Sequence, residues 1–80
     1  MKANIISQNQ VFSFEDFLSI TLPGLKEQFS VLPYHTPLIA SLGQGKIRVK
    51  DKNKEKFFNI KRGVLEVSDK KVDILADLEA

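Results

Sequence analysis

The sequence contains no cysteine, which excludes disulfide bonds and thiolate metal sites and leaves packing and backbone pairing to provide stability. Long hydrophobic runs are also missing. No apolar run is longer than Leu38-Ile39-Ala40, whereas a spanning helix needs about 20 apolar residues and a signal peptide about 7 to 15. We therefore expect neither a transmembrane helix nor a signal peptide, and the composition fits the cytoplasm.

Histidine is almost absent, since His35 is the only one, and it lies between Pro33 and Pro37. Catalysis needs a nucleophile, a base and a device that holds them together. A lone histidine in a proline-flanked turn is more often a packing or interface residue than a base. A small hydrolase centred on His35 is therefore the least favoured interpretation, and we expect no active site.

Motifs for phosphate and calcium are incomplete. The Gly-Gln-Gly-Lys segment 43–46 lacks the upstream glycine of a P-loop and is followed by an isoleucine instead of a hydroxyl residue. The segment 51–62 begins like an EF-hand loop but has Lys56 and Arg62 where such a loop needs glycine and glutamate. We expect no cofactor and no metal ion.

The chain has 80 residues, of which 42% are hydrophobic and 28% charged. A chain of this length buries only roughly 60% of its unfolded surface, so it supports one core. The composition is far from the apolar-poor composition of disordered chains. We expect one folded domain over residues 1–80.

Apolar side chains alternate along most of the chain, as they do in half-buried strands, and turn-forming glycine, proline, asparagine and aspartate residues separate the alternating segments. The alternating sets are Phe12 and Phe14; Leu18, Ile20 and Leu22; Phe29 and Val31; Ile47 and Val49; Phe58 and Ile60; Leu65 and Val67; and Val72, Ile74 and Ala76. The pattern predicts an all-β fold, either a sandwich or a barrel.

One segment also fits a helix. The residues that would share a helical face are Phe14, Phe17, Leu18 and Leu22, and Ser13 and Asp16 are spaced like a capping box. The β-branched Ile20 and Thr21 and the break at residues 23–24 favour the strand. Residues 72–80 are similarly ambiguous.

Basic residues recur at two-residue spacing just before Phe57 and Phe58; they are Lys46, Arg48, Lys50, Lys52, Lys54 and Lys56. This pattern is the basis of an alternative function, a small basic β-barrel that binds single-stranded nucleic acid by charge and stacking. Asp51 and Glu55 interrupt the run, the net charge is only +2, and edge lysines also discourage aggregation. We favour a solvated hairpin face.

The segment 21–24, Thr-Leu-Pro-Gly, is followed at 29–39 by Phe-Ser-Val-Leu-Pro-Tyr-His-Thr-Pro-Leu-Ile. These motifs, with Gly-Val-Leu-Glu-Val at 63–67 and the segment 72–77, closely resemble the epsilon subunit of rotary ATP synthases, whose signature is T-L-P-G and F-G-V-L-P-x-H-x-P-L-I. The likeness covers nearly the entire chain. The combination of motifs at these separations is far more specific than any one of them.

The resemblance implies a two-sheet antiparallel β-sandwich that performs no chemistry and joins the gamma subunit to the c-ring, so that ion-driven rotation reaches the catalytic hexamer. It implies a peripheral position at the cytoplasmic face of a bacterial inner membrane, with no nucleic acid or small-molecule substrate. By position, the residues expected to contact gamma are Ser7, His35, Leu38, Ile39 and Ala40. Those expected to contact the c-ring are Lys26, Glu27, Gln28, Phe29 and Ser30.

The sequence departs from the family pattern in the loop 26–30. Glu27 and Ser30 replace glycines, so we expect a strained or rebuilt backbone there, and Gln28 replaces an acidic residue. The family typically continues into two helices that can inhibit ATP hydrolysis. If Ala80 is the natural end, we expect a subunit that couples without inhibiting itself; if the chain continues, these residues carry no information on inhibition.

Overall fold

The structure is a computed structural model that describes residues 1–79; Ala80, the last residue of the expected domain, lies outside the described residues. The strands are β1 (Lys2–Ile6), β2 (Val11–Phe14), β3 (Ser19–Pro23), β4 (Gln28–Val31), β5 (Leu38–Leu42), β6 (Gly45–Lys50), β7 (Glu55–Val67) and β8 (Lys71–Leu78). Over residues 1–79 the chain forms strands, turns and bends without a helix, and the predicted all-β fold is confirmed. Accordingly, these residues provide no helix that could cross a membrane.

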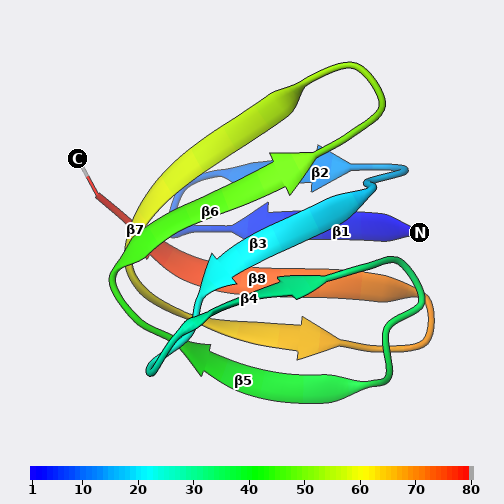
Figure 1. The fold of residues 1–80 in the computed structure, drawn as a ribbon. Helices are drawn as coiled ribbons and strands as arrows, with labels where there is room; N and C mark the ends of the chain where they lie inside the picture. The colour runs from blue at the N-terminus through cyan, green and yellow to red at the C-terminus, as the bar shows by residue number, and fades with distance from the viewer. Residues whose placement is uncertain (80) are drawn as a thin grey trace.

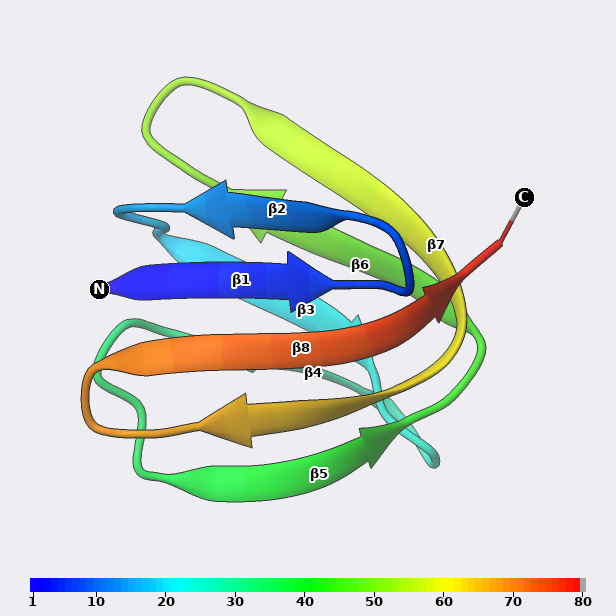
Figure 2. The same cartoon turned by 180° about the vertical axis from the view of Figure 1, so that it is seen from behind.

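Strand β7 belongs to both layers of the sandwich. Its first half pairs with β6, while its second half pairs with β8 on one side and β5 on the other. One layer therefore contains β2, β1, β8, the second half of β7 and β5, and is seen in front in Figure 2. The other contains the first half of β7, β6, β3 and β4, and is seen in front in Figure 1.

The pairing register shifts where β7 passes from one layer to the other. Ile60 pairs with Leu78 and Arg62 with Asp77, so Lys61 is an extra residue on the β7 side. Such a bulge bends a strand and increases its twist. Gly63 follows at once, and a Cβ atom there would lie 2.7 Å from the carbonyl oxygen of Leu75 on β8. The bend thus depends on the missing side chain at Gly63.

The named strand pairs are antiparallel except β1 and β8, which run parallel from the pair Lys2 and Lys71 to the pair Ile6 and Leu75. A tight hairpin forces antiparallel pairing only on strands that follow each other. Strands β1 and β8 come from opposite ends of the described chain, so no turn fixes their relative direction. The sheets are therefore mostly, and not entirely, antiparallel.

The core lies between the two layers, and the alternation in the sequence located most of it. The fully buried side chains of the strands are Ala3, Ile5, Ile20, Leu22, Val31, Ile47, Val49, Ile60, Leu65, Val72 and Ile74. The prediction for Leu18 was wrong: this side chain is 48% exposed, and Phe17 is buried instead. Strand β3 begins only at Ser19, so the alternation does not extend back to Leu18. The sequence also allowed a helix in the segment around residues 14–22 and near the end of the chain. In the structure, residues 19–23 and 71–78 are strands.

We predict that Gly63→Ala lowers the free energy of unfolding by about 1 to 3 kcal/mol, the usual cost of forcing an atom into a filled space. The atom in the way is the backbone oxygen of Leu75, which cannot turn aside as a side chain would. Urea denaturation followed by circular dichroism measures the change.

Gly43→Ala is the matched control. A Cβ atom on Gly43 would come no closer than 3.6 Å to its nearest neighbour, the carbonyl oxygen of Gly24, so this variant should unfold at close to the wild-type urea concentration. Equal stability of the two variants would contradict the proposed constraint at the bend.

Candidate subunit interface

The loop expected to contact the c-ring forms the β3–β4 hairpin. Lys26 and Glu27 lie at its tip, and both are exposed, as are Gln28 and Ser30 at the start of β4. Phe29 differs, because its ring is half-buried against the core and a Cβ atom on Gly24 would lie 3.1 Å from it. Four of the five expected residues are thus available to a partner, whereas Phe29 anchors the hairpin.

The backbone of this hairpin is not strained in the expected way. Among residues 1–79, Tyr34 is the one non-glycine residue with a positive φ, so Glu27 and Ser30 have ordinary torsions despite replacing glycines of the family pattern. The hairpin is instead tied to the end of β5, since Gly43 donates a backbone hydrogen bond of 2.8 Å to the carbonyl oxygen of Pro23. The hairpin therefore contains no left-handed residue.

His35 lies in a tight corner between β4 and β5. Its backbone N–H donates to the carbonyl oxygen of Leu32 at 3.2 Å, which closes a turn with Pro33 and Tyr34 at its centre. The imidazole Nδ1 lies 2.7 Å from the carbonyl oxygen of Thr36, so Nδ1 carries the proton and donates it. The other ring nitrogen, Nε2, is the one that a partner can reach with a hydrogen bond.

Strand β5 divides its three expected contact residues between two faces. Ile39 points outward and is 74% exposed, while Leu38 and Ala40 pack against the core. Their cross-strand partners on β7, Val67 and Leu65, are both buried, which confirms the inward direction. Ile39 is therefore the residue of this strand that a partner can bury, and the other two hold the strand in place.

Ser7 lies far from His35. Its N–H donates to the carbonyl oxygen of Gln10 at 2.9 Å and so closes the turn after β1. The pairing across β5, β7, β8 and β1 places the start of β5 level with the start of β1, whereas Ser7 follows the end of β1. One partner can contact both Ser7 and the β5 corner only by covering the outer face of this layer.

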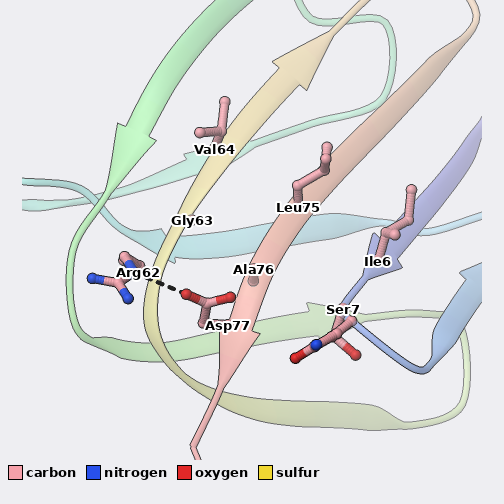
Figure 3. Close-up of a pocket in the computed structure, with 9 residues that line it drawn as sticks. Ile6, Ser7, Arg62, Gly63, Val64, Leu75, Ala76 and Asp77 are labelled. Atoms are coloured by element: carbon pink, nitrogen blue, oxygen red, sulfur yellow. Dashed lines mark hydrogen bonds and ion pairs between the residues drawn. The ribbon is translucent and has the colours of Figure 1, made fainter.

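The outer face of this layer carries an apolar row, defined here as Val64, Leu75, Ile6 and Val11. These residues are directly paired from strand to strand across β7, β8, β1 and β2. Val64, Leu75 and Val11 are 44%, 51% and 63% exposed. Figure 3 shows Val64, Leu75 and Ile6 along neighbouring strands. The alternating pattern of the sequence does not predict this row, although adjacent apolar pairs such as Val64-Leu65 and Ile74-Leu75 are a signal for it.

A shallow groove of about 480 Å³ lies along the apolar row and brings Ser7 to it. At its end the Nε atom of Arg62 donates a hydrogen bond of 2.8 Å to the Oδ2 atom of Asp77, as the dashed line in Figure 3 shows. The charged groups are thus paired with each other at the rim while the apolar row remains uncovered. Apolar centres with polar rims are typical of protein interfaces.

The basic run does not form one face. Lys46, Arg48 and Lys50 point outward from β6, the next two lysines lie around the β6–β7 turn, and Lys56 pairs with the inward Val49. The Nε atom of Arg48 lies 3.4 Å from Glu55, and the Lys46 ammonium lies 5.3 Å from the centre of the Phe57 ring. The basic side chains are thus divided between two sides of the hairpin and its turn, and the Phe57 ring already contacts Lys46. This arrangement favours a solvated hairpin face over a surface that binds single-stranded nucleic acid.

Two further features of the described residues bear on chemistry, the role of Asp51 and the distribution of potential metal ligands. Asp51 Oδ1 accepts hydrogen bonds from the backbone N–H groups of Asn53 and Lys54, at 3.0 and 3.1 Å, so this carboxylate holds the β6–β7 turn. Over residues 1–79, no group of three or more histidine, aspartate or glutamate side chains could hold a metal ion. The surface offers contact area and hydrogen-bonding groups, which are the means of binding another protein.

The family described as "ATP synthase, Delta/Epsilon chain, beta-sandwich domain" matches residues 1–78 of this chain. The ATP synthase epsilon chain of Campylobacter curvus is 43% identical over 91% of this chain and 57% of its own length. That of Leptospira interrogans is 31% identical over 96% of this chain and 61% of its own length. The chain thus spans about three fifths of the length of the curated relatives it matches.

Two solved structures share the fold. The central stalk and c-ring structure of Tetrahymena thermophila mitochondrial ATP synthase contains a chain with a TM-score of 0.83 and 16% identity, covering 95% of this chain and 62% of that one. The Euglena gracilis mitochondrial ATP synthase structure contains one with a TM-score of 0.82 and 22% identity, covering 92% and 48%.

The fold and its outer surfaces define a small β-sandwich with an exposed polar hairpin at β3–β4 and an exposed apolar row on the outer face of one layer. The family match then settles the identity at family level: the chain belongs to the delta/epsilon chain β-sandwich family of ATP synthase.

We predict that Leu75→Thr changes the free energy of unfolding by no more than about 0.5 kcal/mol, because the side chain is half-exposed on the outer face. Ile74→Thr, one position earlier on β8, should cost about 2 kcal/mol or more, since it removes buried apolar volume and buries a hydroxyl group. Urea denaturation of both variants measures the difference. Equal losses would show that the apolar row belongs to the core.

Proposed function

We propose that this protein is a non-catalytic rotor subunit of ATP synthase that couples the gamma subunit to the c-ring. The observation that carries the proposal is the family match, which extends over residues 1–78 and leaves no part of the sandwich unexplained. The partners named in the Tetrahymena structure, a central stalk and a c-ring, support it. Residues 1–80 act as one domain in this proposal, at the cytoplasmic face of a bacterial inner membrane and peripheral to it.

A subunit that joins two partners needs two separate contact surfaces. The β3–β4 hairpin, with Lys26, Glu27, Gln28 and Ser30, is a polar surface at one end of the sandwich and is assigned to the polar loops of the c-ring. The outer face with Ile39 and the apolar row is assigned to gamma, together with the corner at His35. Hydrogen-bonded strands connect the two surfaces, so torque can pass between them without local unfolding.

The first functional prediction concerns gamma. In a titration of the protein with the gamma subunit of its own organism, Ile39→Asp should weaken binding about tenfold or more, because a carboxylate would be buried at an apolar contact. His35→Ala should weaken it as well through loss of the Nε2 contact. Native mass spectrometry confirms the one-to-one complex and isothermal calorimetry gives the affinities.

Lys52→Glu is the matched control, since this exposed residue lies in the turn between β6 and β7, away from the proposed surface. It should bind gamma as the wild type does. A wild-type protein that forms no complex with a folded gamma subunit would contradict the proposed function.

The second functional prediction concerns the c-ring. The double variant Lys26→Glu, Glu27→Lys keeps the net charge of the hairpin but exchanges its signs, so it should leave gamma binding unchanged and disturb pairing with the ring. In the reconstituted synthase we expect reduced ATP-driven ion pumping per ATP hydrolysed. Lys52→Glu, in the turn between β6 and β7 and away from both proposed surfaces, serves as the control. Normal pumping by the double variant would remove the hairpin from the c-ring contact.

A further inference from the structure

Tyr34 has an unfavourable backbone conformation and an exposed side chain. Its φ of 65° lies in the left-handed region, and its side chain is 78% exposed. With Pro33 before it and a hydrogen bond from the N–H of His35 to the carbonyl oxygen of Leu32, it occupies the third position of a type II turn. Glycine or asparagine is the usual residue there, because a bulky side chain is strained at positive φ.

The backbone of the turn is held by groups other than the Tyr34 ring. The Tyr34 N–H donates to the Sδ atom of Met1 at 2.9 Å, and the Met1 side chain is fully buried. Pro33 fixes the preceding torsion, and the bond between His35 and Leu32 closes the turn. An exposed ring adds little to folding stability, so the Tyr34 side chain does not compensate for the strain in its own backbone. Such strain is typical of functional sites.

Leu32 extends the apolar character of the turn. It is 58% exposed and occupies the first position of the same turn, two residues before Tyr34. A tyrosine with a fixed backbone and only two side-chain torsions loses little entropy when a partner buries it. Tyrosine is also enriched among the residues that dominate the affinity of interfaces. Together these two side chains form a corner anchor, the name used below for Leu32 and Tyr34.

We propose that the corner anchor inserts into an apolar pocket of the gamma subunit and that Tyr34 is the dominant residue of this contact. The inference rests on the proposed function and adds the residue that provides its affinity. Strand β4 leads from the β3–β4 hairpin to this turn, so the anchor lies at the end of the sandwich away from the proposed c-ring surface (Figure 1). It is continuous with His35 and Ile39, which belong to the proposed gamma surface.

The pocket should be apolar with one hydrogen-bonding group, because a buried tyrosine hydroxyl needs a partner. Tyr34→Phe keeps the ring and loses the hydroxyl, so it should bind gamma more weakly than the wild type but more tightly than a variant without the ring. Tyr34→Gly and Tyr34→Asn remove the ring while fitting the left-handed torsion. They separate the contact made by the ring from the shape of the backbone.

The experiment measures gamma binding by calorimetry and melting temperature for the wild type and these three variants. We expect Tyr34→Gly and Tyr34→Asn to bind gamma about tenfold or more weakly and to melt no lower than the wild type. Leu25→Ser is the matched control, since Leu25 is 73% exposed but lies in the β3–β4 hairpin, and its gamma affinity should be that of the wild type.

The outcomes are distinguishable. If the wild type binds gamma and the two ring-free variants bind equally well, the corner anchor is overturned and the proposed function remains. If these variants melt well below the wild type, Tyr34 serves folding and the inference is again overturned. If the wild type does not bind a folded gamma subunit, the proposed function fails first and the inference fails with it.

Discussion

The rest of the structure depends on the bend in β7. This strand hydrogen-bonds to β6 with its first half and to β8 and β5 with its second half, so it holds the two layers together through the backbone. The extra residue Lys61 and the missing side chain at Gly63 allow the chain to turn without giving up these pairs. If the bend failed, the buried side chains of the two layers would no longer face each other.

Side chains close the opposite side of the sandwich, where β2 approaches the first half of β7. The rings of Phe12 and Phe14 contact the ring of Phe58 at centroid distances of 4.9 and 6.1 Å. Tilted and edge-on arrangements of this kind are favourable for aromatic pairs. The layers are thus joined by hydrogen bonds at the bend of β7 and by aromatic contacts at β2, which keeps the end loops at fixed positions relative to each other.

The proposed function requires a part that transmits torque between two partners, and a rigid body of this kind meets that requirement. Its polar hairpin and its proposed gamma surface are fixed to the same sheets, so movement of one requires movement of the other. The turn at Tyr34 is also held rigidly. Met1 and Pro33 keep the Tyr34 backbone in a left-handed conformation that a tyrosine would rarely adopt alone. Under the proposed function, these groups would be held in position before a partner binds.

The sequence by itself determined the all-β class, the inward face of most strands and the family, because alternation and turn residues are local properties and the motifs at 21–24 and 29–39 are specific. It did not determine which residues of β5 face outward, where Ile39 is exposed while Leu38 and Ala40 face the core. Nor did it determine that Leu18 is exposed, or that the apolar row forms across four strands. These facts depend on register between strands distant in the chain. Only the folded layers bring such residues together, because pairing a strand one residue further along would reverse every side chain on it.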